Sequence, residues 1–314
     1  MNTLLVAPSP HQKHPITTQR IMLCVLVSLL PAVIAGGYYF GLRAIYLVLL
    51  CTIGSVAMEG WCRILMKRSQ TISDLSAAVT GMLLALNLPV TIPAWQALIG
   101  CFVAIVIVKQ LFGGLGQNFA NPAIVARIVL MLSFTSNMTT WVIPRYWKSD
   151  SDVITGATPL VTGTASYRDL LLGNTGGCIG ETCAIALIIG GVYLMIRRII
   201  SPSTPLAFIG TVALLNLIAG NDVIYQLLSG GLLLGAFFMA TDYVTTPITW
   251  KGKLVFGIGC GVMTFLIRQF GGYPEGVSFS ILLMNLTVPY IEVLTRQDRL
   301  GIAKVKKNKE GAGK

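Results

Sequence analysis

Long runs of apolar residues, each near the length that crosses a bilayer, dominate this chain. A lipid-spanning helix needs about twenty such residues. Ten runs approach that length and predict ten helices, over residues 21–40, 44–62, 75–88, 95–112, 122–143, 180–196, 205–219, 224–240, 254–270 and 277–294. The third and seventh runs are short, and Pro89 and Pro93 follow the third, so these two helices are expected to be broken or re-entrant. The pattern predicts an all-α polytopic membrane protein.

Composition agrees with a membrane location. Charged residues make up 11% of the 314 positions, against about a quarter in soluble domains. The net charge of +11 does not indicate nucleic-acid binding, because the basic residues lie between apolar runs rather than on one folded face. The seven cysteines form no C-x-x-C pair and are interpreted as small hydrophobic residues, so no metal site is predicted.

The basic residues also predict which side of the membrane each loop occupies. With a cytoplasmic N-terminus, most of the 23 Lys and Arg residues fall on the cytoplasmic side, as the positive-inside rule requires. The outside set is only Arg43, Arg145, Lys148, Arg168 and Arg268. Both termini are therefore expected in the cytoplasm of a bacterium, and the loop 144–178 outside its inner membrane.

Two parts of the chain resemble each other. Residues 84–93 match residues 238–247, and each stretch is followed by an apolar run that ends in Phe-Gly-Gly. This repetition predicts two five-helix units, and an odd number of spans per unit inverts the second copy. The predicted organisation is a cytoplasmic tail (1–20), a first repeat (21–143), the external loop (144–178), a second repeat (179–295) and a basic cytoplasmic tail (296–314).

The external loop contains a threonine in an unusual setting. Thr158 follows Gly156 and Ala157, which leave steric room, and precedes Pro159, which favours an extended backbone before it. Such small-residue turns are also common in plain connectors. The alternative is a site at which a bulky group is attached to the hydroxyl.

At this motif the chain resembles the family of the D subunit of the Rnf electron-transport complex and the B subunit of the sodium-pumping NADH:quinone oxidoreductase. The resemblance extends over residues 112–123, 180–182, 240–247 and 270–280. It implies FMN joined through its phosphate to Thr158. The implied cofactor-binding residues around Thr158 are Asp152, Thr155, Gly156, Ala157, Pro159 and Leu160.

The short N-terminal tail and Thr155, where the quinone-reducing homologue typically has Ser, favour the Rnf branch. The resemblance then implies an electron-relay subunit of an oxidoreductase that couples electron flow between ferredoxin and NAD to sodium or proton transport. It implies the A, B, C, E and G subunits of the Rnf complex as partners, of which G is a flavoprotein. It also implies a flavin transferase for maturation and a non-covalent riboflavin. No complete active site is expected on this chain.

Acidic residues in or beside apolar runs are costly and are therefore functional candidates. Asp242, with Thr245 and Thr246, is a candidate contact for a second flavin or an ion. Glu292 and Asp74 are candidates for an ion path, although Asp74 also suits a helix cap. The remaining candidates are Glu59 and Glu181, the latter also suited to a helix N-terminus. Arg127 is expected to pair with one of these carboxylates or with a cofactor phosphate.

Two other classes of protein fit part of this pattern. An inverted pair of five-helix units is also an architecture of small-solute channels and transporters, which would carry no chromophore. A scaffold whose external loop docks a partner is the third alternative. The glycine-rich run 113–116 lacks the Lys-Ser/Thr of a phosphate loop, and we interpret it as close packing or a helix break.

Overall fold

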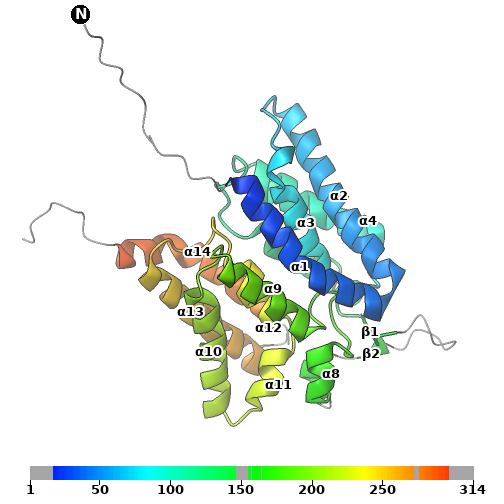
Figure 1. Ribbon diagram of the computed structural model, residues 1–314, viewed down its shortest axis with the longest axis vertical. Coiled ribbons are helices and arrows are strands. Elements are labelled where there is room, and N and C mark those ends of the chain that lie inside the picture. Colours follow the sequence, from blue (N-terminus) through cyan, green and yellow to red (C-terminus); the bar gives the residue numbers. More distant parts are fainter. Residues whose placement is uncertain (1–16, 146–154, 157, 164, 272–275, 297–314) are drawn as a thin grey trace, which may run out of the picture.

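The computed structural model describes residues 17–145, 155–156, 158–163, 165–271 and 276–296, and these residues are mostly helical (Figure 1). The elements up to residue 145 are α1 (Thr18–Phe40), α2 (Leu42–Leu65), the 3₁₀ turn η1 (Ile72–Asp74), α3 (Ser76–Leu86), α4 (Ala94–Phe102), η2 (Val103–Gln110), α5 (Pro122–Ser133), α6 (Thr135–Met138) and β1 (Trp141–Val142). The segment η2 continues α4 with π-helical geometry.

A second set of helices follows in the later part of the described chain. The elements are β2 (Thr155–Gly156), which pairs antiparallel with β1, α7 (Pro159–Thr162), α8 (Tyr167–Leu172), α9 (Ala184–Ile196), α10 (Ser203–Ile218), α11 (Val223–Leu228), α12 (Leu232–Leu234), the π-helical η4 (Gly235–Met239), α13 (Trp250–Phe270) and α14 (Val277–Thr295). Trp141 faces Gly156, and Val142 faces Thr155.

Four helices of the described chain are long and apolar enough to cross a membrane: α1, α2, α13 and α14. Five shorter apolar helices accompany them: α3, α4 with η2, α5, α9 and α10. The structure therefore agrees with a polytopic membrane protein, whereas the count of ten spans and the inverted duplication stay predictions. As expected, α3 is short and ends before Pro89, but α10, in the seventh run, is continuous.

Two of the expected spans differ from continuous helices. The fifth run is helical as α5 only to Ser133, after which α6 and β1 follow. The eighth run, 224–240, is divided into α11, α12 and η4. Gly230 and Gly231 have φ values of 69° and 68° at the division. Glycine adopts this left-handed conformation without the steric cost of a Cβ, so the pair ends one helix and redirects the chain.

Small residues let the helices approach closely, as is common between helices in membranes. A Cβ placed on Gly81 of α3 would lie 2.4 Å from the Cys51 carbonyl oxygen of α2. A Cβ on Gly190 of α9 would lie 2.2 Å from the Ser28 carbonyl oxygen of α1. The early and late helices therefore meet along α1 and α9, and a second contact joins α5 to α14.

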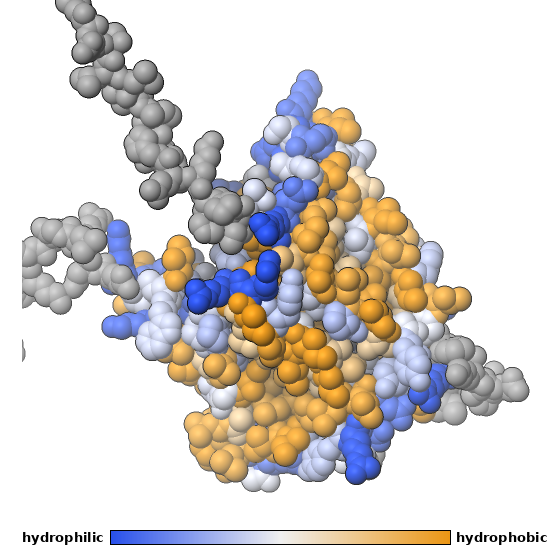
Figure 2. Space-filling model, in the orientation of Figure 1, coloured by the Kyte–Doolittle hydropathy of each residue, from blue (hydrophilic) through white to orange (hydrophobic). Residues whose placement is uncertain are grey.

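Hydrophobic side chains cover a broad band of the visible face, and hydrophilic side chains gather at opposite edges of it (Figure 2). The short strands and α8 lie at one end of the molecule, opposite the start of α1 (Figure 1). An apolar belt between polar ends is the surface that a bilayer requires.

Candidate functional site

Thr158 is the N-cap of α7 and lines a cavity together with residues of α8 and α11. Thr158 is only 3% exposed. The cavity beside it has a volume of about 20 Å³ and is lined by Thr158, Pro159, Leu170, Thr175, Gly176, Gly177, Glu181, Thr182, Leu228, Ser229 and Gly230. A space of this size holds about one water molecule. The hydroxyl has the chemistry to accept a phosphoryl group, but a flavin does not fit inside while Thr158 is seated in this way.

A buried ion pair lies on the inner side of this cavity. Arg127 Nη1 of α5 donates to Glu181 Oε1 at 2.6 Å and to Asn87 Oδ1 at 2.5 Å. The charged side chains of Arg127 and Glu181 are 5% and 4% exposed. The expected pairing of Arg127 with one of the acidic candidates is therefore confirmed, and its partner is Glu181. Because Glu181 also lines the Thr158 cavity, the pair connects that cavity to the helices of the first half.

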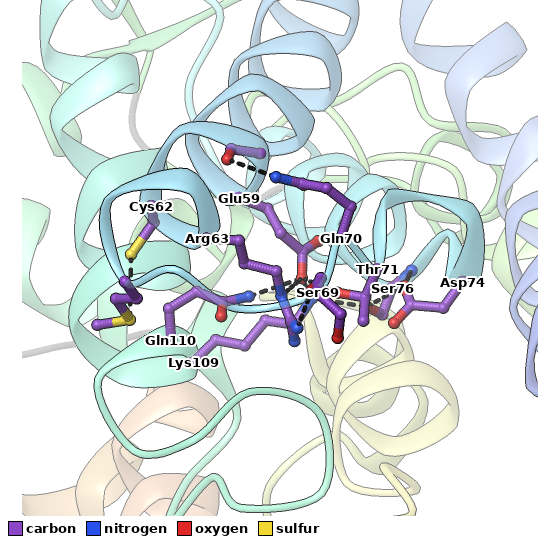
Figure 3. Close-up of polar contacts among 12 residues, drawn as sticks. Glu59, Cys62, Arg63, Ser69, Gln70, Thr71, Asp74, Ser76, Lys109 and Gln110 are labelled. Atoms are coloured by element: carbon purple, nitrogen blue, oxygen red, sulfur yellow. Dashed lines mark hydrogen bonds and ion pairs between the residues drawn. The ribbon is translucent and has the colours of Figure 1, made fainter.

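A second buried polar cluster lies where α2, η1, α3 and η2 meet (Figure 3). Glu59 Oε1 accepts hydrogen bonds from Gln110 Nε2 at 2.7 Å and from Thr71 Oγ1 at 3.3 Å, and it pairs with Lys109 Nζ at 3.0 Å. Glu59 is fully buried, and Lys109 is 1% exposed. Within the described residues, Glu59 Oε2 and Gln110 Oε1 are buried without a hydrogen-bond partner. A charge such as that of Glu59 is retained in an apolar interior only when it is paired, and here Lys109 is its partner.

The cluster continues to Asp74 through one serine. Lys109 Nζ donates to Ser76 Oγ at 2.6 Å, and Ser76 Oγ donates to Asp74 Oδ1 at the same distance. Asp74 Oδ1 also accepts from the Ser76 backbone nitrogen at 2.8 Å. The N-cap of α3 is Leu75, so Asp74 is not the helix cap that its position suggested, although it binds the first N–H of the helix from one residue further back. A continuous hydrogen-bonded path therefore connects Glu59, Lys109, Ser76 and the partly exposed Asp74.

Lys109 and Asp242 line one larger cavity between the two sets of helices. Its volume is about 90 Å³, and its polar lining residues are Ser76, Thr80, Lys109, Asn118, Asn121, Thr241 and Asp242. Apolar side chains such as Leu83, Leu194 and Phe238 complete the wall. Asn118 Oδ1 is buried and has no hydrogen-bond partner in the part of the chain that the structure describes. The cavity thus offers donors and acceptors beside an apolar face.

The other predicted residues take simpler positions. Thr245 Oγ1 donates to Asp242 Oδ2 at 3.2 Å, and Thr246 Oγ1 donates to the Asp242 carbonyl at 2.6 Å, so the hydroxyls stabilise the bend around Asp242. Glu292 Oε1 accepts from the Ile248 nitrogen at 3.3 Å, an exposed contact with the segment before α13. Asp152 and Ala157 lie outside the described residues.

Lys109, Gln110 and Asn118 were not predicted as site residues. Lys109 was predicted to be one of the cytoplasmic charges because it lies at the end of an apolar run, but the structure buries it. The available signal was Glu59, an acidic residue inside a run, which requires a nearby cation. The run 113–116 is a helix break, as expected, and a Cβ on Gly114 would lie 2.8 Å from Arg63 Nη2.

Helices of membrane-spanning length, an apolar belt and ion pairs buried between helices define a polytopic membrane protein. The chain belongs to the NQR2, RnfD, RnfE family, whose model matches residues 5–301.

Curated relatives match nearly the whole chain. The D subunit of the Na⁺-translocating ferredoxin:NAD⁺ oxidoreductase complex of Acetobacterium woodii is 48% identical, over 97% of each chain. The D subunit of the proton-translocating ferredoxin:NAD⁺ oxidoreductase complex of Clostridium ljungdahlii is 39% identical, over 96% of this chain and 97% of the relative. The D subunit of the ion-translocating oxidoreductase complex of Stutzerimonas stutzeri is also 39% identical, over 91% and 92% of the two chains.

Proposed function

We propose that this protein is an electron-relay subunit of an ion-translocating ferredoxin:NAD oxidoreductase, which carries FMN on Thr158 and works with other Rnf subunits. The match over nearly the whole length of three relatives, each named as the D subunit of such a complex, carries this proposal. Thr158 supports it further, because it stands at the position of the motif for which the family resemblance implies flavin attachment, and its hydroxyl can accept a phosphoryl group. FMN would supply reversible electron acceptance, and this chain would hold and orient it.

We propose that a non-covalent flavin, riboflavin, binds in the cavity between the two sets of helices, which at about 90 Å³ is smaller than a flavin and would have to widen to admit it. Asn118 Oδ1 could accept from the ring N–H of a flavin, while Lys109 and Asn121 carry donors for its carbonyl groups. The apolar wall around Leu83 and Phe238 suits the face of the ring. Asp242, flanked by Thr245 and Thr246, borders the same cavity, so these residues would act at this second flavin.

A denaturing gel tests the covalent flavin. The wild-type chain, matured with its flavin transferase, should show a fluorescent band that Thr158→Ala abolishes. Thr182→Ala is a matched control, because Thr182 lines the same cavity but is not the attachment residue. A band that survives Thr158→Ala, or is absent from the wild type, would contradict the assignment.

The proposal also concerns which ion the complex transports, sodium or protons. The relatives from A. woodii and C. ljungdahlii are named for sodium and protons respectively, so the names leave both ions open. The path from Glu59 to Asp74 is our candidate for ion or proton movement within this chain, with Glu292 as a more exposed alternative. Sodium dependence of ferredoxin-driven NAD reduction in inverted vesicles distinguishes the two ions.

A further inference from the structure

Two contacts between described residues hold the segment that carries Thr158 against α11. The Tyr225 hydroxyl of α11 donates to the Pro159 carbonyl of α7 at 2.6 Å. The Leu160 side chain packs on Gly230, where an added Cβ would lie 2.2 Å from Leu160 Cδ1. Both contacts involve the residues that directly follow Thr158 in sequence. They therefore fix the position of the threonine itself.

This position is incompatible with attachment of a flavin. In the transfer, the Thr158 oxygen forms a bond to the flavin-side phosphorus of flavin adenine dinucleotide and gives up its proton. The phosphoanhydride bond breaks, and AMP leaves. The donor and the transferase must therefore reach the hydroxyl directly, whereas Thr158 is 3% exposed and its cavity holds about one water molecule.

We propose that α7 is a latch, in which Tyr225 and the Leu160–Gly230 contact keep Thr158 seated, and that α7 must leave this seat before flavin can be attached. The proposal rests on the proposed function of Thr158. Tyr225 is then a positioning residue that acts through Pro159. Because only the open state reacts, the observed rate of attachment falls with the fraction of chains that are open.

Tyr225 and Gly230 each take part in one contact of the latch, so a single substitution at either residue should open it measurably. Tyr225→Phe removes the hydroxyl and keeps the ring. Loss of one hydrogen bond of ordinary strength should speed attachment by about fivefold. Gly230→Ala should also speed it, because the new Cβ displaces Leu160 and because alanine at this positive φ strains the turn on which Leu160 packs. Tyr167→Phe is the matched control, since the Tyr167 hydroxyl bonds to Asp222 rather than to α7.

The experiment uses full-length chains made without the transferase and held in lipid nanodiscs. Purified transferase and flavin adenine dinucleotide are added, and the initial rate of labelling is read from gel fluorescence. Hydrogen exchange of α7 and α9 is measured on the same samples. Faster labelling of Tyr225→Phe and Gly230→Ala, with faster exchange confined to the α7 region, supports the latch.

Three outcomes count against the proposal in different ways. Equal labelling rates in the wild type, Tyr225→Phe and Gly230→Ala overturn the latch and leave the covalent flavin standing. Faster labelling with an equal rise of exchange in α9 also overturns it, because the whole fold has then loosened. If no chain takes flavin at Thr158 under any condition, the proposed function fails, and the latch fails with it.

Discussion

At the scale of single residues, the arrangement around Glu59 shows how a charge persists inside the helical body. Glu59 Oε1 accepts hydrogen bonds from Thr71 and Gln110 and forms an ion pair with Lys109, so all three interactions involve one carboxylate oxygen. Removing one partner of a buried ion pair costs more than replacing both, because the remaining charge stays desolvated. Lys109 should therefore matter for stability as well as for any ligand in the neighbouring cavity.

Lys109→Met should destabilise the protein by about 3–5 kcal/mol, since Glu59 keeps its buried charge without its closest cation. The double variant Lys109→Met/Glu59→Gln should recover a large part of that loss. Unfolding free energies in mixed micelles for the four proteins of this cycle provide the check. Additive effects of the two substitutions would show that the pair is not coupled.

Glu181 should influence a flavin on Thr158 through its charge. Glu181→Gln leaves the buried positive charge of Arg127 without its carboxylate partner beside the Thr158 cavity. An added positive charge in this region favours the addition of electrons, so the substitution should raise the reduction potential of a flavin on Thr158. We expect a shift of about 30 mV or more, which is tenfold in the equilibrium constant of a two-electron couple. Redox titration monitored by absorbance measures it, and Glu292→Gln, at an exposed contact, should leave the potential unchanged.

At the scale of helices, sequence reasoning located most elements but not their interruptions. The runs for α1, α2, α13 and α14 were found because their apolar character is continuous. The division of the run 224–240 depends on two adjacent glycines with positive φ, and hydropathy alone does not reveal it, because glycines also occur within continuous helices such as α13. An apolar run favours a continuous helix at such positions, whereas the low helix propensity of glycine opposes one. In the run 224–240 the helix is interrupted.

Close helix packing predicts that alanine substitutions at two glycines have different effects on stability. Gly81→Ala should destabilise by about 1–3 kcal/mol, because its Cβ would overlap the Cys51 carbonyl across the α2–α3 contact. Gly210→Ala in α10 has open space around its Cβ and should be neutral or stabilising by up to about 1 kcal/mol. Thermal unfolding in detergent compares the two variants. Equal effects would contradict the packing argument.

At the scale of the whole molecule, the charge pattern predicts an orientation that labelling can check. In a cysteine-free background, Lys251→Cys, in the exposed start of α13, should react with a membrane-impermeant reagent only from the cytoplasmic side. Tyr167→Cys of α8, which is 48% exposed, should react only from the outside. Spheroplasts and inverted vesicles provide the two sides, and the reverse pattern would invert the predicted topology.

The sequence was sufficient for the class of protein and the family, because these depend on composition and on contiguous residues, whereas the flavin on Thr158 stays a prediction. It did not locate the partner of Arg127 or the burial of Lys109. Those facts depend on residues 54 and 50 positions apart, Arg127 with Glu181 and Lys109 with Glu59, which only the packed helices bring together. Long-range ion pairs leave no periodic signal along the chain.

The π-helical geometry of η2 has a consequence for how this family can vary. Its hydrogen bonds reach one residue further than those of an α-helix, so the segment holds an extra residue within the same length. Loss of that extra residue would return the segment to α-helical spacing and leave the residues after it facing the same way. Lys109 and Gln110, at the end of η2, would then still face Glu59. A second deletion has no extra residue to absorb it and would rotate Lys109 and Gln110 by about 100° away from Glu59. The segment between Ala94 and Gln110 should therefore tolerate the loss of one residue and not of two.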